Sequence, residues 1–496
     1  MLARLCLTSL ATLLVLALLS GRAEAQGLYY RSIPLGERAI GLGGAYTGIA
    51  DDPSATYYNP AGLMAGGRFQ LLGSLSSIVF SKQKTENAFQ VGDENKDLES
   101  SHTTTLPHFV GTVVKFGKQA FGDHRYAIAY SSFEVGRERF NVGFTDINPE
   151  NSADLRLHDD YRMRWWGVSF AAQIKEKLSL GVSSFLSNQS YGYGEDIGFA
   201  SGGTLEDDGV RVGAESVTSS TGLGIGSWAL VFRLGALYRV NRRWQIGVMF
   251  QPPGAPLKSD GNIFRRFVAD STTGSSYFLF DQGGLDVRAP IPFELRTGAR
   301  YKINAVTTLS VDVAVTGPVR DRKVFDVPVE LENLDLSIGT YFANSTKRLT
   351  TPNAAIGVEH LFGKAVVAGG LFTNISAAPN VPETSTTYAP DQISMYGASL
   401  AVGMDTKGYR LTLGATGYFG RGDALSFTVD RAAQVTEYNR SKSNVSALVL
   451  YVAGAVSVAS KGAKQVQEKY MERKAQKQNG DEEEPDAEAD ADELVQ

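Results

Sequence analysis

Three arginines of this sequence are placed where they could bind a negatively charged ligand. Arg233, Arg296 and Arg300 fall on the polar side of segments in which apolar and polar residues alternate. An arginine on that side can hold the carboxylate of a ligand through charge-assisted hydrogen bonds. It can equally form a structural ion pair with a nearby acid, for which Glu294 and Asp312 are candidates. The residues leave both interpretations open.

The sequence motifs give little support for catalysis or for metal binding. None of the 5 His has a partner at the H-x-x-x-H or H-E-x-x-H spacing, and no G-x-S-x-G nucleophile elbow occurs. The stretch LHDDY at 157–161 could ligate calcium in a loop, although surface acids are the commoner explanation. GLGG at 41–44 is not part of a dinucleotide-binding pattern. We therefore expect no enzyme activity, no catalytic residues, no metal site and no cofactor.

Residues 1–25 have the pattern of a secretory signal peptide. Arg4 precedes the apolar run LATLLVLALL, and the small residues AEA precede Gln26. Cleavage after Ala25 would leave a mature chain without cysteine, since the single Cys6 lies inside the signal. Disulfides and thiol catalysis are then excluded. An uncleaved membrane anchor is the alternative.

Composition narrows the class of protein. The chain has 53 Gly, 21 Tyr, 25 Phe and only 20% charged residues, and its net charge of −5 offers no basic footprint for nucleic acid. Its length would allow two or three soluble domains. An aromatic-rich and glycine-rich chain with short alternating segments also fits an outer-membrane β-barrel.

Strand periodicity favours the barrel. In MRWWGVSFAAQIKEKLSLGVSSFL (163–186), Val168, Phe170 and Leu180 lie on one face, and residues such as Ser179 lie on the other. A soluble β-sandwich alternates as well. However, the polar faces here are unusually small, and aromatic residues such as Trp166 gather near strand ends, as expected for a wet lumen and an interfacial girdle.

Fourteen strands are predicted between residues 69 and 456. They lie near 69–79, 109–116, 125–133, 163–174, 178–186, 228–240, 244–250, 293–303, 308–315, 353–360, 365–372, 394–404, 409–419 and 444–456. Short turns such as KEK and NRR alternate with long connections such as 187–227, 251–292 and 316–352. This pattern is typical of a bacterial outer-membrane barrel with both ends in the periplasm. We predict an all-β fold, a closed transmembrane antiparallel β-barrel over residues 69–456.

Residues 26–68 precede the first predicted strand and are rich in glycine and turn residues. Glycine-rich apolar backbone can turn tightly and pack closely, and the pair Asn59-Pro60 is a turn signal. Pro60 restricts Asn59 to extended backbone, and the Asn59 side chain can then satisfy backbone groups that would otherwise stay unpaired. We expect this segment to fold inside the barrel as a hatch, that is, a plug.

The stretch GERAIGLGGAYTGIADDPSATYYNPAGL (36–63) resembles the N-terminal hatch of the FadL family, which includes the TodX-type channels. Asn59, Pro60 and Ala61 match the hatch motif of that family, and PFELRTGARYKIN (292–304) is similar to one of its mid-barrel strands. The resemblance implies passive, hatch-gated transport of hydrophobic molecules across the bacterial outer membrane. Long-chain fatty acids are the first substrate it implies, and aromatic hydrocarbons the second. The family's ligand residues do not map onto this sequence.

Two features leave room for another role. PorV-type outer-membrane barrels share a similar GGAxxxxADDxxAxxxNPAGL start and serve secretion as docking proteins rather than as channels. Residues 457–496 depart from the FadL pattern, because a charged and finally acidic run follows the last strand. We expect a partly disordered, acidic periplasmic tail. It is either simply solvated or contacts a periplasmic partner, while the barrel wall contacts outer-membrane lipids.

Overall fold

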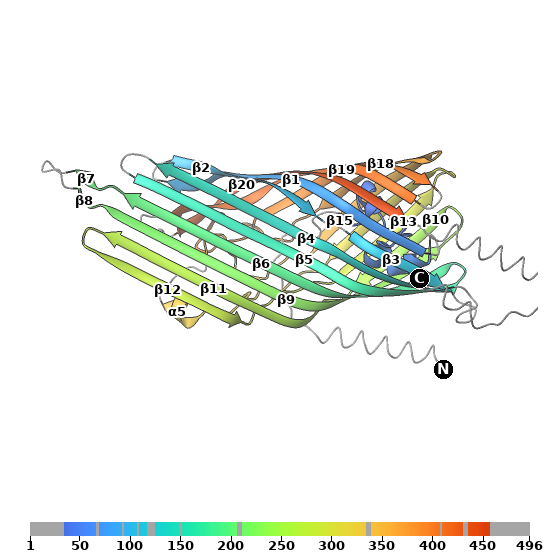
Figure 1. The fold of residues 1–496 in the computed structure, drawn as a ribbon, viewed down its shortest axis with the longest axis horizontal. Coiled ribbons are helices and arrows are strands. Elements are labelled where there is room, and N and C mark those ends of the chain that lie inside the picture. The colour runs from blue at the N-terminus through green and yellow to red at the C-terminus, as the bar shows by residue number, and fades with distance from the viewer. Residues whose placement is uncertain are drawn as a thin grey trace, which may run out of the picture.

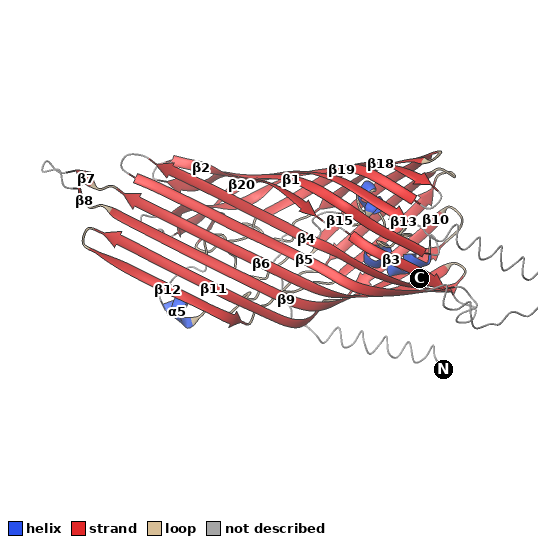
Figure 2. Cartoon of the chain, in the orientation of Figure 1, coloured by secondary structure: helices blue, strands red, loops and turns tan. Residues whose placement is uncertain are grey.

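A computed structural model describes most of the chain (Figures 1 and 2). The described residues are 34–65, 69–91, 94–106, 109–116, 125–147, 151–205, 211–333, 339–406, 409–429 and 435–456. The predicted signal peptide (1–25) and the predicted acidic tail (457–496) lie outside these ranges. Both stay predictions.

Within the described ranges, fourteen strands form a closed antiparallel barrel. In ladder order they are β1 (Phe69–Val91), β3 (Phe109–Phe116), β4 (Arg125–Ile147), β5 (Asn151–Lys175), β6 (Leu178–Ser201), β9 (Glu215–Arg239), β10 (Trp244–Gln251), β13 (Glu294–Lys302), β14 (Thr307–Thr316), β15 (Thr351–Phe362), β16 (Ala365–Asn374), β18 (Gln392–Thr406), β19 (Tyr409–Val429) and β20 (Val435–Val456). The last strand, β20, pairs with β1 from Leu71↔Val456 to Thr85↔Ser443 and closes the barrel. The predicted fold class and strand number are confirmed.

Several strands run farther from the periplasmic turns than the sequence indicated. The segment 187–227, predicted as a long loop, is largely the paired continuation of β6 and β9. The segment 251–292, also predicted as a loop, contains β11 (Ala255–Ser271) and β12 (Gly274–Leu285). The outer positions of the β6 and β9 extensions are mostly glycine and small polar residues, so hydrophobic alternation does not mark them. In-register backbone pairing stabilises them instead.

Smaller elements complete the side of the barrel that lies far from the chain ends (Figure 1). They are β2 (Glu94–Leu106), which pairs with β1, the short pair β7 (Thr204–Leu205) and β8 (Arg211–Val212), the helix α5 (Val329–Asn333) and β17 (Thr384–Ser385). The alternation of short and long connections makes this the extracellular side of an outer-membrane barrel.

The alternation predicted from the sequence sets the two faces of the wall. Leu180 and Leu400 are 44% and 60% exposed on the outer face. Ser183 and Ser399 face the lumen, where their hydroxyls donate to the carbonyls of Thr56 (2.8 Å) and Gly41 (3.1 Å). The predicted inside–outside assignment is confirmed at these positions.

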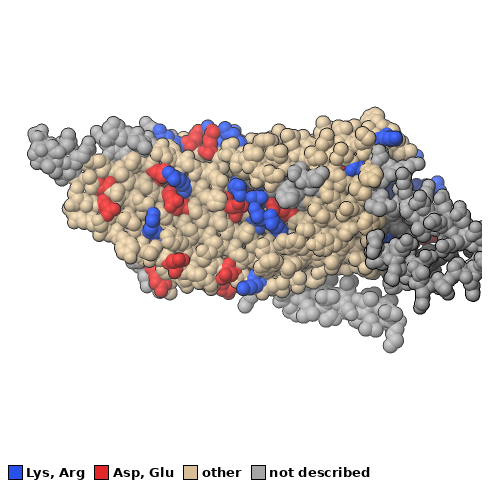
Figure 3. Space-filling view, in the orientation of Figure 1, with Lys and Arg blue, Asp and Glu red and all other residues tan. Residues whose placement is uncertain are grey.

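Aromatic pairs bound the apolar band of the outer face. The rings of Trp166 and Trp228 stack with centroids 6.0 Å apart, and those of Trp244 and Tyr301 lie 4.5 Å apart near the short turns. Figure 3 shows a wall with few charges nearer the chain ends and charged groups gathered toward the other half. Such a band between aromatic girdles is the surface of a transmembrane barrel.

Residues 34–65 fold inside the end of the barrel that carries the short turns, and we call them the plug. The plug contains α2 (Glu37–Gly41), α3 (Ala55–Tyr58) and the 3₁₀ helix η1 (Pro60–Met64). Nearly all of its residues are buried, and its apolar side chains form one core with inward residues of the wall. No helix among the described residues is long and apolar enough to span a membrane.

Candidate functional site: the lumen cavity and its plug

The predicted motif Asn59-Pro60-Ala61 fixes the plug to the wall. Asn59 is extended (φ −166°, ψ 100°), as the following proline requires, and Pro60 begins η1. The Asn59 side-chain amide donates to the carbonyl oxygens of Thr47 (3.2 Å) and Ala236 (3.0 Å), and its Oδ1 accepts from the Ala61 N–H (3.2 Å). One side chain thus joins two turns of the plug to β9.

Glycines of the wall admit the motif at close range. A Cβ at Gly181 would lie 2.4 Å from the Pro60 carbonyl carbon, and one at Gly235 would lie 2.2 Å from Asn59 Oδ1. Both distances are too short for a real Cβ atom, so the plug backbone lies directly against the backbone of β6 and β9. This contact explains the small lumen-facing residues that the sequence shows.

Two of the three predicted arginines clamp the plug from β9 and β13. Arg233 Nη2 lies 2.9 Å from Glu294 Oε2, and its guanidinium stacks 3.9 Å from the centre of the Tyr57 ring and donates to the Tyr57 carbonyl. Arg296 pairs with the same carboxylate, its Nε lying 3.0 Å from Glu294 Oε1, and its guanidinium lies 5.2 Å from the centre of the Tyr58 ring. The structural ion pair with Glu294 is therefore present.

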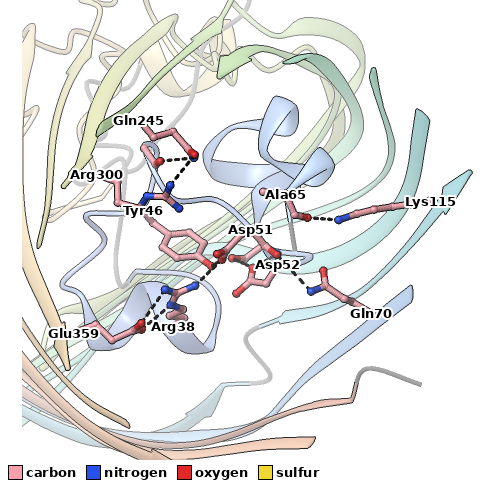
Figure 4. A network of polar contacts seen from close by, with 12 residues as sticks. Arg38, Tyr46, Asp51, Asp52, Ala65, Gln70, Lys115, Gln245, Arg300 and Glu359 are labelled. Atoms are coloured by element: carbon pink, nitrogen blue, oxygen red, sulfur yellow. Dashed lines mark hydrogen bonds and ion pairs between the residues drawn. The ribbon is translucent and has the colours of Figure 1, made fainter. Parts of the chain in front are cut away.

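The third arginine and the second candidate acid contact other groups. Arg300 Nη2 donates to Gln245 Oε1 (2.9 Å), and Gln245 Nε2 donates to the Gly48 carbonyl of the plug (2.9 Å; Figure 4). Asp312 accepts from the backbone N–H groups of Tyr46 (3.1 Å) and Thr47 (2.8 Å). Both residues face the lumen and hold the plug.

A further ion-pair network was not predicted. Arg38 on α2 joins Glu359 on β15 (Nε–Oε2 2.6 Å) to Asp51 (Nη1–Oδ1 2.6 Å), and the Tyr46 hydroxyl donates to Asp51 (3.0 Å; Figure 4). Burial favours the protonated form of Asp51, but the Arg38 guanidinium outweighs it and holds the pKa of Asp51 below its ordinary value. Arg38 and Glu359 are 321 positions apart, so sequence patterns could not have paired them.

Beside this network lies a second carboxyl group, Glu37, which is easier to protonate than Asp51. Glu37 is buried and accepts a hydrogen bond from the Thr412 hydroxyl of β19. Burial raises the pKa of the Glu37 carboxyl to about 7, although this hydrogen bond and nearby arginines act in the opposite direction. We therefore expect the contact of α2 with β19 to weaken as the Glu37 carboxyl loses its proton.

A cavity of about 190 Å³ lies in the lumen on the extracellular side of the plug. About half of the residues in its wall are aliphatic or aromatic, and the others are polar or charged, among them Arg137, Glu138, Arg139 and Asp159. The apolar lining includes Val79, Leu98, Phe140, Leu157, Tyr193, Tyr341, Tyr388, Ile393, Met395, Tyr418, Leu425 and Val445. Among the polar lining, Asp391 accepts from Gln83 Nε2 (2.8 Å) and the Tyr388 hydroxyl (3.3 Å), and burial raises the pKa of Asp391 to about 6. A concave site that combines aromatic surface with polar and charged groups can hold a small molecule that has both an apolar and a polar part.

The barrel wall is interrupted beside this cavity. β4 pairs with β3 only up to Phe109↔Phe133, and no ladder joins β4 beyond that pair to β2 among the described residues. The two strands are joined there by side chains, since the Asn141 N–H donates to Ser100 Oγ (3.1 Å) and Leu98 and Val142 belong to one buried cluster. Residues of both β2 and β4 line the cavity, so it borders this seam.

Besides a small space beside Glu37 and Arg38, two other cavities have plug residues in their walls. One of about 40 Å³ is lined by Tyr57, Trp165, Arg233 and Glu294, together with neighbouring residues. The other, of about 570 Å³, lies at the short-turn end, and its wall includes Met64. The plug thus stands between space that opens toward the periplasm and the cavities above it. Among the described residues, no cluster of three or more His, Cys, Asp or Glu could hold a metal ion.

The fold and this arrangement define a class, a transmembrane β-barrel closed by its own N-terminal segment. No protein-family model and no curated protein matches the sequence. Among solved structures, a Pseudomonas aeruginosa FadL homologue is 13% identical over 86% of this chain and 99% of its own, with a TM-score of 0.58. The ΔS2S3 mutant of the monoaromatic hydrocarbon channel TodX is 14% identical over 84% of this chain and 98% of its own, with a TM-score of 0.51. The chain therefore has the FadL-type fold, as its hatch-like stretch predicted.

Proposed function

We propose that this protein is a passive channel for hydrophobic molecules in the bacterial outer membrane, and that long-chain fatty acids are its substrates. The observation that carries the proposal is the lumen cavity of about 190 Å³, which combines aliphatic and aromatic side chains with polar and charged ones and lies above a plug. The apolar band of the outer face supports the membrane location. The similar structures, a FadL homologue and a monoaromatic hydrocarbon channel, support the chemistry of the cargo.

The substrate reaches the cavity from the extracellular side and leaves it by one of two routes. A shift of the plug would connect it to the periplasmic space of about 570 Å³. The seam between β2 and β4 would instead release an apolar molecule sideways into the membrane, where lipid accepts it without cost to its apolar surface. Neither route needs a coupled ion or nucleotide.

An amphipathic cargo is favoured over a purely apolar one by the polar part of the lining. Gln83 and His102 face the same cavity as the aromatic residues and can hydrogen-bond a carboxyl head group. The ligand role of Arg233, Arg296 and Arg300 stays a prediction. Arg233 lines the small inner cavity, so a head group that passed the plug would meet it there.

A docking role, as in PorV-type barrels, is the second candidate. The tightly bonded plug favours it, because a permanently closed barrel would not conduct. The cavities above and below the plug favour transport.

Uptake by cells separates these roles. The full chain would be produced in a host that lacks its own fatty acid channel, and entry of a labelled long-chain fatty acid and of toluene would be measured. Ser81→Trp fills the cavity from β1, whereas the neighbouring Phe80→Trp changes only the exposed outer face. We expect Ser81→Trp to abolish fatty acid uptake and Phe80→Trp to retain it. No uptake by the wild type would favour docking. Uptake unaffected by Ser81→Trp would show that the cargo does not pass through this cavity, and entry of toluene alone would overturn the fatty acid assignment.

A further inference from the structure

The cavity of about 570 Å³ at the short-turn end of the barrel is rich in positive charge, and we call it the basic mouth. Four of its lining residues are cations, namely Arg125, Lys177, Arg239 and Arg242, and one, Glu176, is an acid. All five are exposed. Within the described ranges none of the four cations forms an ion pair, so the mouth carries a net positive charge.

Strand periodicity turns the cations of the wall toward the lumen. On β9, Arg239 falls on the same face as the buried Leu237. On β4, Arg125 falls on the same face as the buried Ala127. Lipid head groups meet the opposite face of these strands, so the two guanidiniums stay available to a group that enters the mouth.

Two further cations lie beside the mouth and have neutral partners (Figure 4). Lys115 donates to the carbonyl of Ala65 at the end of the plug, and Arg300 donates to Gln245. Ala65 and Gln245 both line the mouth. The acids of the plug network are already paired with Arg38. These charges add to the field of the mouth, which the low-dielectric walls of a cavity concentrate on its interior.

The same chain contains a segment of the opposite charge. Residues 481–496, DEEEPDAEADADELVQ, contain 9 Asp or Glu and no Lys or Arg, and we call them the acidic run. Strand β20 ends at Val456, which pairs with Leu71 near the start of β1. The chain therefore leaves the wall at the short-turn end, on the side where the mouth opens.

The intervening chain is long enough to bring the acidic run to the mouth. At the 1.5 Å per residue of an α-helix, residues 457–480 would span about 36 Å. Arg125 lies on β4, three strands from β20 in ladder order, which is about 15 Å at the usual strand spacing. A tether of this length raises the local concentration of the run to about the millimolar range, so several individually weak ion pairs can hold it.

We propose that the acidic run binds in the basic mouth of its own barrel, with its carboxylates against the four cations that line it. A bound run would lie beneath Met64 and Ala65 of the plug, which form part of the same wall. The inference goes beyond the proposed function, and it rests neither on the transported substrate nor on the lumen cavity above the plug.

Two other partners compete for the acidic run. Residues 457–480 contain 6 Lys or Arg and 2 Glu, so the tail could pair with itself. The mouth is favoured because a cavity of one sign of charge attracts an opposite charge more strongly than the same cations would in water. The mouth of a second copy offers the same charges, but the tether favours the mouth of the same chain.

The test is zero-length cross-linking of the purified full chain in detergent micelles at low ionic strength. A carbodiimide joins a lysine amine to a carboxylate only where the two are in contact, and mass spectrometry of the digested protein identifies the joined residues. Lys177 is the reporter amine of the mouth. Isotope-labelled and unlabelled protein are mixed, so that cross-links within one chain are distinguished from those between two. The heat-dependent shift in gel mobility verifies that each barrel is folded.

We expect the wild type to give cross-links between Lys177 and the acidic run within one chain. Arg239→Gln/Arg242→Gln removes two cations but neither the reporter amine nor the run, and should lower the yield at least 5-fold. Arg242→Gln and Arg243→Gln form a matched pair, because the two arginines are neighbours in one turn and only Arg242 lines the mouth. Arg242→Gln should lower the yield, and Arg243→Gln should retain it.

Cross-links of the run to lysines of 457–480 alone, or none at all, would overturn the proposal. Links to Lys177 that join labelled to unlabelled chains would assign the mouth to a second copy and overturn it as well, as would a yield that the double variant leaves unchanged. If the double variant does not fold, the salt response of the wild type decides. The yield at Lys177 should fall at least 5-fold in about 0.5 M NaCl, and an unchanged yield would refute the site.

The uptake assay separates this inference from the proposed function. A chain that gives the Lys177 cross-link but carries no hydrophobic substrate would overturn the channel and support the tail site. A chain that carries substrate without this cross-link would do the reverse.

Discussion

Replacing Asn59 by alanine would loosen the plug while leaving the barrel folded. The substitution removes the donors to the carbonyls of Thr47 and Ala236 and the acceptor for the Ala61 N–H, all of them buried or partly buried. A hydrogen bond of this kind contributes about 1 kcal/mol net, so the loss is about 3 kcal/mol. Because about 1.4 kcal/mol is a factor of ten in an equilibrium constant, the open plug should become roughly 100-fold more populated. The strand ladders do not involve the Asn59 side chain, so barrel stability should change little.

The assay is the entry of a small chromogenic solute into intact cells that produce the full chain. Asn59→Ala should raise this leak well above the wild-type level and alter uptake of the hydrophobic substrate, with normal amounts of protein in the membrane. Asn241→Ala is the matched control, because Asn241 caps an exposed turn through Arg243 and Trp244 and leaves the plug untouched. If Asn59→Ala, and also deletion of residues 27–67, left both leak and uptake at wild-type values, the gating role of the plug would be refuted.

Three further changes test the wall, the pH response and the buried ion pairs. Leu180→Arg should lower barrel stability by about 2–4 kcal/mol if Leu180 lies near the bilayer midplane, whereas Ser179→Arg, which faces the periplasmic cavity, should cost less; equal costs in a urea folding titration would contradict the assigned faces. The pKa of Glu37, raised from 4.5 to about 7 in the docked plug, makes docking strongest below pH 4.5 and progressively weaker up to about pH 7, so the solute leak should rise across that window. Glu37→Gln should flatten the pH dependence of the leak, and a profile unchanged by it would assign the response to another group. Glu294→Gln leaves two buried guanidiniums without their carboxylate and should cost about 3–5 kcal/mol in the same titration, whereas Asp326→Asn in an exposed pair should cost less than about 1 kcal/mol; similar losses for the two would show that the Glu294 pairs are not structural.

The sequence by itself determined the class of fold and the faces of its wall. A period of two is a local property, because successive side chains of a strand point to opposite sides whatever the strand pairs with. The lipid position of Leu180 and the lumen position of Arg233 could therefore be read directly. Asn59 and Pro60 were equally readable, since proline restricts its predecessor and an asparagine side chain bonds nearby backbone.

The ends of the strands and the ion-pair partners needed the tertiary structure. The extensions of β6 and β9 carry small residues on their outer positions, so only pairing with each other marks them as strands. Arg233 and Arg296 had two candidate acids, and packing of the plug against the wall decided that Glu294 pairs with them while Asp312 binds plug backbone. Such partners are set by the order of strands around the barrel, which local patterns do not contain.

The cavity of the barrel and the seam beside it were decided only by the tertiary structure. A register shift between Glu134 and Gly136 changes which residues of β4 lie opposite β5. The seam beside the cavity likewise exists because β2 pairs with β1 and leaves the edge of β4 unpaired in the described ranges. A sequence pattern specifies each strand alone, whereas a bulge and an interrupted ladder are properties of two strands together. For that reason the barrel was predictable from the residues, while its cavity and its seam were not.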